Sequence, residues 1–223
     1  MDFFDLIGKR DLHLKKLGDE IMKITFVRHM QTVSNAKGIL QGSSDTELSE
    51  FGLEQCKIFV ENVDFSDIDV IYSSTLTRAK FLAEMISDKY NKKLINDDRL
   101  KEIWLGEWEG LTWKEVTVLY KDFLQEWYKD NVNIKAPGGE SYKELQERVM
   151  TVIKEITNED WKHVLIVTHG AVIRTILCTI MGMDLQNRNK FMIENGSISQ
   201  IELSKYKSKL LALNCKTIET KEM

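Results

Sequence analysis

Short apolar runs alternate along the chain with stretches of helical periodicity. Lys23–Val27, Asp69–Tyr72 and His163–Thr168 are rich in β-branched and aliphatic side chains, which predicts buried strands. Alternating segments at Ser197–Leu203 and Lys209–Leu213 predict two further strands. Strands that alternate with helices indicate an α/β fold, here a three-layer α/β/α sandwich around a mainly parallel central sheet.

Helical patterns follow the predicted strands. Leu82 and Ile86 recur at helical spacing after the second run, and residues 171–181 (AVIRTILCTIM) are apolar enough for a buried helix. A long amphipathic pattern, Glu140–Ile156, begins behind a Pro-Gly-Gly break, and another helical pattern opens at Ser49. These patterns predict the helical layers of the sandwich.

Reactive side chains come directly after three of the predicted strands. The first run ends in Arg28 and His29, the second lies just ahead of Arg78, and the third ends before His169. Ligands of such sheets bind beyond the carboxyl ends of the strands. We therefore expect these four side chains to meet in one site.

The chain contains no linker or internal repeat, which predicts a single domain. It has 223 residues and one proline, a length that suits one α/β domain. We expect residues 22–223 to form this domain and residues 1–21, which mix acids and bases, to be an N-terminal extension rather than a signal peptide. The segment at about 104–139 holds four of the five tryptophans and is predicted to be a cap-like insertion over the site.

Composition excludes several classes of function. The net charge is −4, so nucleic acid is not an expected partner, and no apolar run is long enough to span a membrane. The three cysteines are far apart and form no CxxC pair, which argues against a disulfide framework and a zinc ribbon. We expect a cytoplasmic protein, and the sequence carries no indication of its oligomeric state.

The candidate side chains suit phosphoryl transfer. Two arginines pair well with the oxygens of a phosphate dianion, and a neutral imidazole is a competent nucleophile near pH 7. Arg28, Arg78, His29 and His169 supply these groups. A carboxyl group must then protonate the leaving alkoxide, and Glu102 is the candidate.

Six motifs in order along the chain resemble those of the histidine phosphatase (phosphoglycerate mutase-like) superfamily. They are Arg28-His29-x-x-Thr32-x-x-Asn35, Leu40-Gln41-Gly42, Ser73-Ser74 with Arg78-Ala79, Leu100-x-Glu102 with Gly106-x-Trp108-Glu109-Gly110, Pro137-Gly138-Gly139-Glu140-Ser141, and Val167-x-His169-Gly170. The resemblance covers Lys23 to about Ser197.

The resemblance implies a role for each matched residue. His29 would attack phosphorus and become phosphohistidine, while Arg28, Arg78 and His169 hold the phosphoryl group. Glu102 would act as acid for the leaving group and then as base for water. The substrate-binding residues would be Thr32, Asn35, Gln41, Gly42 and Gly170. The family needs no metal or other cofactor, and its substrate would be a small-molecule phosphate monoester.

Met30 departs from the family pattern, which usually has glycine after the nucleophilic histidine. A side chain must be accommodated here, where the backbone turns from strand to loop. We expect an active site nonetheless, because no catalytic group is lost.

Several alternatives stand beside a phosphatase. Mutases of the family follow their glutamate with a basic and phenolic run, whereas Glu102 is followed by Ile-Trp-Leu-Gly, which favours hydrolysis over phosphoglycerate mutase activity. A phosphate-ligand sensor without turnover is a second alternative, and a metal site of His29, His169 and Glu102 is a third. The tryptophan-rich insertion favours a substrate with apolar surface, for which alpha-ribazole 5′-phosphate is the example.

Overall fold

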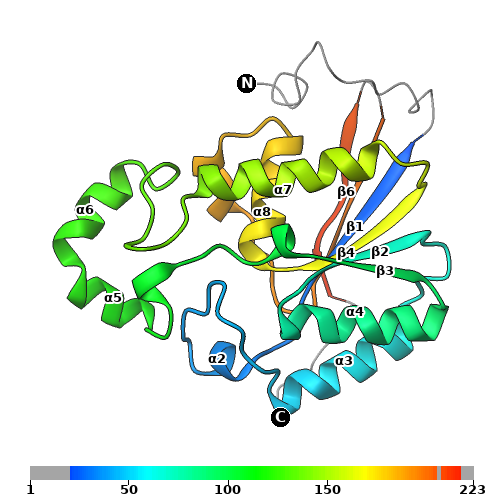
Figure 1. Cartoon of the computed structure of the whole chain (residues 1–223), viewed down its shortest axis with the longest axis horizontal. Helices are drawn as coiled ribbons and strands as arrows, with labels where there is room; N and C mark the ends of the chain where they lie inside the picture. Colours follow the sequence, from blue (N-terminus) through cyan, green and yellow to red (C-terminus); the bar gives the residue numbers. More distant parts are fainter. Residues whose placement is uncertain (1–20, 205–206, 217–223) are drawn as a thin grey trace.

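A computed structural model describes residues 21–204 and 207–216 of the chain (Figure 1). Its sheet has the strand order β3-β2-β4-β1-β5-β6. The strands are β1 (Met22–Arg28), β2 (Val70–Ser74), β3 (Lys93–Asp97), β4 (His163–Thr168), β5 (Ile198–Leu203) and β6 (Ser208–Cys215). The first four are mutually parallel, while β5 and β6 pair antiparallel at one edge. The predicted mainly parallel sheet is confirmed.

Helices cover both faces of this sheet (Figure 1). The α-helices are α2 (Val33–Ala36), α3 (Glu50–Asn62), α4 (Thr77–Tyr90), α5 (Trp113–Leu119), α6 (Lys121–Lys129), α7 (Tyr142–Thr157) and α8 (Gly170–Ile180). Short 3₁₀ helices are η1 (Asp98–Leu100), η2 (Gly106–Trp108) and η3 (Leu185–Lys190). Helices α7 and α8 lie on one face and α3 and α4 on the other (Figure 1), so the three-layer α/β/α prediction is also confirmed.

Alternating side chains of β4 divide the core into two clusters. Val164 and Ile166 pack with α7 and α8, whereas Leu165 and Val167 pack with α3 and α4. All four are fully buried. This is why the strand is a continuous apolar run in the sequence: a central parallel strand buries both faces.

The sequence patterns did not predict β3 or helices α5 and α6. Strand β3 is an edge strand with exposed Lys93 and Asn96, so its apolar pattern is weak. Helices α5 and α6 belong to the 104–139 segment and build a small third cluster around Trp108, Val116 and Leu124. In Figure 1 these two helices stand at one end of the molecule, beyond the sheet.

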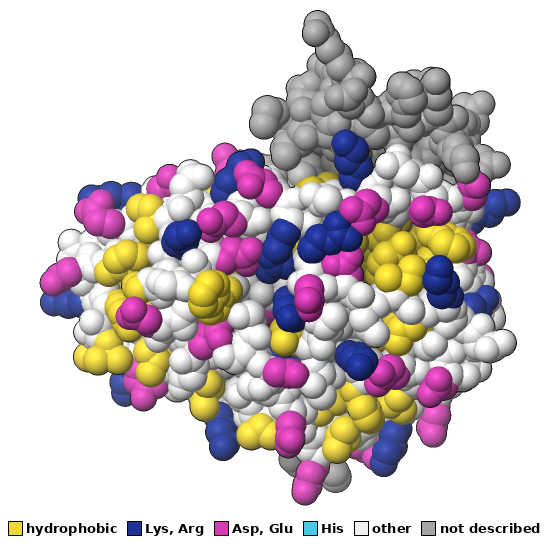
Figure 2. Space-filling model, viewed as in Figure 1, with side chains coloured by type: hydrophobic (Ala, Val, Ile, Leu, Met, Phe, Trp, Pro, Cys, Tyr) yellow, Lys and Arg dark blue, Asp and Glu magenta, His cyan; other side chains and the backbone are white. Residues whose placement is uncertain are grey.

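Neither surface charge nor helix hydropathy marks a special surface among the described residues on the face shown in Figure 2. On the face shown in Figure 2, acidic and basic side chains are interspersed. No helix in the described part of the chain has the length and hydropathy to cross a bilayer. The predicted extension lies outside the described residues except for Ile21, and the cytoplasmic location stays a prediction.

Candidate active site

The two histidines lie at the ends of neighbouring parallel strands. Arg28 of β1 is opposite Thr168 of β4, and His29 and His169 follow them directly. The His29 amide donates to the Thr168 carbonyl oxygen at 3.0 Å. The two ring centroids are 5.1 Å apart, with 58° between the ring planes. Strand register therefore brings both imidazoles to the carboxyl edge of the sheet.

A main-chain contact sets the tautomer of His29. Its Nδ1 lies 2.7 Å from the Met30 carbonyl oxygen, and because a carbonyl only accepts, Nδ1 carries the hydrogen. Burial lowers the pKa of His29 well below its usual value, and the charges of Arg28 and Arg78 lower it further. The ring is therefore a neutral imidazole near pH 7, with the lone pair on Nε2.

Ser74, at the end of β2, contacts the second histidine. His169 Nε2 is 2.7 Å from Ser74 Oγ, and that oxygen accepts from the Leu76 amide at 3.2 Å. Because a hydroxyl can donate one hydrogen bond and accept two, Ser74 can partner Nε2 in either tautomer of His169. The other ring nitrogen, Nδ1, is buried and has no hydrogen-bond partner among the described residues. Burial lowers the pKa of His169 well below its usual value, as do the charges of Arg78 and His29.

Main-chain carbonyls orient both arginines. Arg28 Nη1 donates to the Ile193 oxygen at 2.6 Å. Arg78 donates through Nη1 to Ser44 and through Nη2 to Gly42, each at 2.7 Å. The Nε atoms of both arginines are buried without a partner in the described part of the chain. Each guanidinium is therefore held in place while part of its hydrogen-bonding capacity stays unused.

Glu102 follows η1 and lies over the first turn of α8. Its Oε2 accepts from the Ala171 amide at 3.2 Å and its Oε1 from the Ile103 amide at 3.0 Å. Burial lowers the pKa of Arg28 and of Arg78, and the negative charge of Glu102 opposes this. Both guanidinium groups stay charged at any working pH, so a carboxylate and two cations surround the neutral imidazole.

Seven of the ten predicted site residues line one cavity of about 260 Å³: Arg28, His29, Asn35, Gln41, Gly42, Arg78 and Glu102. The rest of its wall is mainly apolar and aromatic: Ile39, Leu40, Ile103, Leu105, Trp108, Trp113, Trp127, Tyr142, Ala171 and Arg174. The cavity thus has a charged end at the sheet edge and an apolar wall to which the 104–139 segment contributes.

Three predicted residues are not part of the cavity lining: Thr32, Gly170 and His169. Thr32 caps α2 by accepting from the Asn35 amide at 3.0 Å, and its hydroxyl donates to Gln41 Oε1 at 2.8 Å. Gly170 lies against Arg28, since a Cβ added there would be 3.5 Å from Arg28 Nε. Thr32 and Gly170 therefore support side chains that line the cavity.

Met30 points away from the cavity. Its side chain is 2% exposed and packs in the cluster formed with α3 and α4. Gly196, with φ of +70°, makes room for it, because a Cβ added there would be 2.6 Å from the Met30 sulfur. The missing glycine in the motif is thus accommodated by packing, and only the Met30 carbonyl contacts the His29 ring.

Asn195 is a site residue that the sequence patterns did not indicate. Its Nδ2 lies 2.9 Å from the His29 carbonyl oxygen, 3.2 Å from that of Met30 and 3.2 Å from Asn35 Oδ1. It comes from the loop before β5, where no periodicity marks it. This amide ties the loop that carries the nucleophile candidate to α2.

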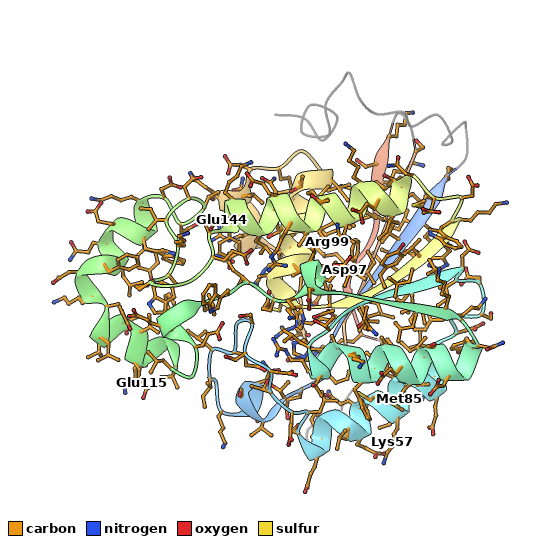
Figure 3. The ribbon with its side chains drawn as sticks, viewed as in Figure 1. Lys57, Met85, Asp97, Arg99, Glu115 and Glu144 are labelled. Carbon is orange, nitrogen blue, oxygen red and sulfur yellow. The ribbon has the colours of Figure 1, made fainter. Side chains whose placement is uncertain are left out.

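Arg148 of α7 is a second unpredicted residue. It donates to the Arg99 carbonyl at 2.6 Å and to the Glu102 carbonyl at 3.1 Å, and it pairs with Glu140 at 2.6 Å. Arg99 in turn pairs with Asp97 at 2.6 Å, and both lie beside α7 in Figure 3. These contacts fix the segment that presents Glu102.

The metal-site hypothesis has no geometric support. Within residues 21–204 and 207–216, no three His, Cys, Asp or Glu side chains are grouped so that they could hold an ion. His29, His169 and Glu102 are therefore not arranged as a metal-ligand set. The positive charge beside them comes from Arg28 and Arg78, which disfavour a bound cation.

Comparison with known proteins defines the class. The profile of the Histidine phosphatase superfamily (branch 1) matches residues 24–216. The chain belongs to this superfamily and is an enzyme of its phosphatase branch, as its motifs predicted.

Three relatives illustrate the similarity. Phosphoserine phosphatase 1 of Hydrogenobacter thermophilus is 32% identical over 195 residues, which cover 87% of this chain and 92% of that protein. The metal-independent phosphoserine phosphatase of Arabidopsis thaliana is 32% identical over 192 residues, covering 84% of this chain and 79% of that protein. The crystal structure of the alpha-ribazole phosphatase from Shigella flexneri has a TM-score of 0.80 at 23% identity and covers 90% of this chain and all of that one (100%), a likeness in fold.

Proposed function

We propose that this protein hydrolyses a small-molecule phosphate monoester through a phosphohistidine at His29, without a metal. The observation that carries the proposal is the 2.7 Å contact from His29 Nδ1 to the Met30 carbonyl. It leaves the Nε2 lone pair for attack in a cavity that also holds Arg28, Arg78 and Glu102. A desolvated, neutral imidazole beside two cations is what attack on a phosphate dianion requires.

In the first half-reaction, Nε2 of His29 forms a bond to phosphorus while the bond from phosphorus to the ester oxygen breaks. Arg28 and Arg78 bind the non-bridging oxygens, whose charge they stabilise in the transition state. The side-chain amide of Asn35, which lines the cavity, is a further donor to these oxygens. For His169, which lies outside the cavity lining with its ring centroid 5.1 Å from that of His29, the same role rests on the family resemblance alone. Glu102, in its protonated form, gives its proton to the leaving oxygen, so the alcohol departs neutral.

In the second half-reaction, water attacks the phosphorus of the phosphohistidine. Glu102 is now the carboxylate and takes a proton from that water, since a group that acts as acid in one step is suited to act as base in the next. The new oxygen–phosphorus bond forms as the nitrogen–phosphorus bond breaks. Inorganic phosphate leaves and the neutral imidazole of His29 is restored.

We also propose that residues 104–139 act as the cap over this cavity. Trp108, Trp113 and Trp127 from this segment line it. The apolar wall excludes water from the phosphoryl group until the alcohol has left, and it gives the organic part of the ester a surface to contact.

Metal independence and hydrolysis agree with the relatives. One relative is named as a metal-independent phosphoserine phosphatase and another as a phosphoserine phosphatase. These names favour hydrolysis of a small phosphate ester over phosphoglycerate mutase activity. Alpha-ribazole 5′-phosphate, the example that the sequence suggested, has the support of the aromatic wall alone.

The test is phosphate release in the presence of EDTA. Wild-type protein is compared with His29→Ala and with a control, His163→Gln, which changes a histidine bonded to Thr25 and Asp67 away from the cavity. We expect turnover of p-nitrophenyl phosphate and phosphoserine that His29→Ala lowers at least about 10³-fold and the control leaves nearly unchanged.

The alternatives predict other results. A mutase would interconvert phosphoglycerates faster than it releases phosphate. A sensor would bind phosphate and release none from any ester. Equal release by wild type and His29→Ala would contradict the assignment of the nucleophile.

A further inference from the structure

The cavity contains one more cation than the phosphoryl chemistry uses. Arg28, Arg78 and Arg174 line it together with a single carboxylate, that of Glu102. When Glu102 carries the proton for the leaving group, three positive charges face the cavity. A phosphate dianion offsets two of them. The third has no counter-charge from the proposed reaction.

Arg174 is unpaired within residues 21–204 and 207–216. No hydrogen bond or ion pair joins its guanidinium to another described residue, and its Nε is buried without a partner. Two other arginines have partners. Arg148 pairs with Glu140, and the buried Arg188 donates through Nη1 to the Leu185 carbonyl oxygen and stacks on Tyr142, with 3.5 Å from its guanidinium carbon to the ring centroid. A half-buried cation without a nearby anion is unfavourable unless a ligand supplies the negative charge and the hydrogen-bond acceptors.

Arg174 lies on α8 and lines the same cavity as Arg28 and His29. It comes one turn after Gly170, on the same helix face, and Gly170 lies against the Arg28 side chain. Its charge lowers the pKa of Arg28 more than that of Arg78 does. Arg28 and Arg78 lower the pKa of His29, whereas Arg174 is not among the charges that do so.

We infer that Arg174 is a specificity-determining residue that binds a carboxylate on the organic part of the substrate. The substrate class is then a phosphate monoester with a carboxylate close to the ester oxygen. The guanidinium fork matches such a carboxylate bidentately. This inference rests on the proposed function, because it concerns the same cavity and assumes that the phosphoryl group lies at His29.

The test compares two esters that differ only by a carboxylate, O-phosphoserine and O-phosphoethanolamine. We expect Arg174→Met to lower kcat/KM for phosphoserine about 10–100-fold, the usual effect of losing a charge-assisted hydrogen bond, and to change that for phosphoethanolamine less than about threefold. Arg174→Lys keeps the charge but loses the fork, so its loss is intermediate. Lys101→Met is the matched control: it removes a charge one residue from Glu102 that is already paired with Asp98 at 2.7 Å, and it leaves the ratio of the two substrates unchanged.

A binding measurement makes the result independent of turnover. In the His29→Ala protein, phosphoserine is expected to bind more tightly than phosphoethanolamine, and Arg174→Met is expected to remove the difference. Equal losses for both esters would place Arg174 on the phosphoryl group and overturn the inference, as would no loss for either. Release of phosphate from p-nitrophenyl phosphate with no preference for phosphoserine in either assay would also overturn it, while leaving the proposed function standing. Persistent hydrolysis by His29→Ala would instead refute the proposed function.

Discussion

The Met30 side chain and the Gly196 backbone fit against each other on the side of the loop away from the cavity. A Cβ on Gly196 would lie 2.6 Å from the Met30 sulfur, and its φ of +70° is a conformation that L side chains rarely adopt. The methionine thus replaces the usual glycine without entering the site. What the chemistry needs from residue 30 is its carbonyl oxygen, which any residue supplies.

We expect Gly196→Ala to lower the free energy of unfolding by about 2–4 kcal/mol, because it adds both backbone strain and a clash. The control is Gly138→Ala, which has a similar φ of +68° and open space around the added Cβ. Urea unfolding measures both. Equal losses of unfolding free energy in the two variants would contradict the inference that Gly196 makes room for the Met30 side chain.

The same packing predicts the effect of restoring the family's residue. Met30→Gly removes a buried side chain and is expected to cost about 2–4 kcal/mol of stability. It is not expected to raise kcat, since the side chain does not touch the cavity. Steady-state kinetics measure this, and a rise of orders of magnitude would show that Met30 impairs the natural enzyme.

The two buried histidines predict an acid-sensitive fold. Burial lowers the pKa of His29 and of His169 well below 6.5 in the folded state, so only the unfolded chain takes up their protons just below that pH. Their neutral state therefore favours folding fully above pH 6.5, and stability falls as the pH drops below it. We expect each to add about 1 kcal/mol per pH unit to this fall.

Urea unfolding between pH 7.5 and 5.5 measures the slope. The double variant His29→Asn/His169→Asn is expected to flatten it by the sum of the two contributions. An unchanged slope would mean that the histidines titrate alike in the folded and unfolded chain.

At the scale of elements, η1 and α7 together present Glu102. Arg148 on α7 donates to the Glu102 carbonyl at 3.1 Å and to the Arg99 carbonyl at 2.6 Å. Because these bonds go to the main chain, they fix where the carboxylate stands without touching it. Arg148 is a positioning residue in this account.

We expect Arg148→Met to lower kcat for an alkyl phosphate about 10–100-fold, since small misplacements of a proton donor are costly. For p-nitrophenyl phosphate the loss is expected to be smaller, because that leaving group needs less protonation. Lys143→Met is the control, since it removes a charge from the same helix α7 while its Nζ donates to Gln146 of that helix rather than to the Glu102 segment. Equal losses for both esters with Arg148→Met would contradict the positioning role.

The elements also show what the sequence could predict. The strands that bury both faces are unbroken apolar runs and were all predicted: His163–Thr168 at its bounds, and the predicted Lys23–Val27 and Asp69–Tyr72 within one or two residues of β1 and β2. Strand β3 was not predicted, because two of its five residues are exposed at the edge of the sheet and its apolar pattern is weak. The charges and histidines that follow strands were recognised. Asn195 was not, because its contacts with His29 and Asn35 span 166 and 160 residues and no local pattern encodes them.

At the scale of the whole molecule, the proposed cap has a core of its own. Trp108 is buried at its centre and makes edge-on contacts with Trp113, Tyr120, Phe123 and Trp127. This cluster is distinct from the two that flank the sheet, and Leu105 packs against both it and the cluster formed with α7 and α8. We therefore expect the cap to lose order more readily than the sheet.

We expect Trp108→Ala to loosen α5 and α6 selectively, because a large aromatic side chain in a small core has few neighbours to compensate for its loss. Hydrogen exchange is expected to speed up in these helices and not in β1 or β4, and KM is expected to rise. Trp161→Ala is the control, since Trp161 packs against the sheet's larger cluster. Faster exchange throughout the molecule with Trp108→Ala would contradict a separate cap core.

The most direct test of the account is to identify the phosphorylated atom during turnover. Protein mixed with radiolabelled phosphoserine or p-nitrophenyl phosphate is quenched in alkali within milliseconds and digested. We predict an acid-labile label on the peptide that contains His29. With p-nitrophenyl phosphate, whose leaving group needs little protonation, the label is expected to be greater in Glu102→Gln, because water then lacks its base. Label on another residue, or steady turnover with no label at any time, would contradict a phosphohistidine at His29.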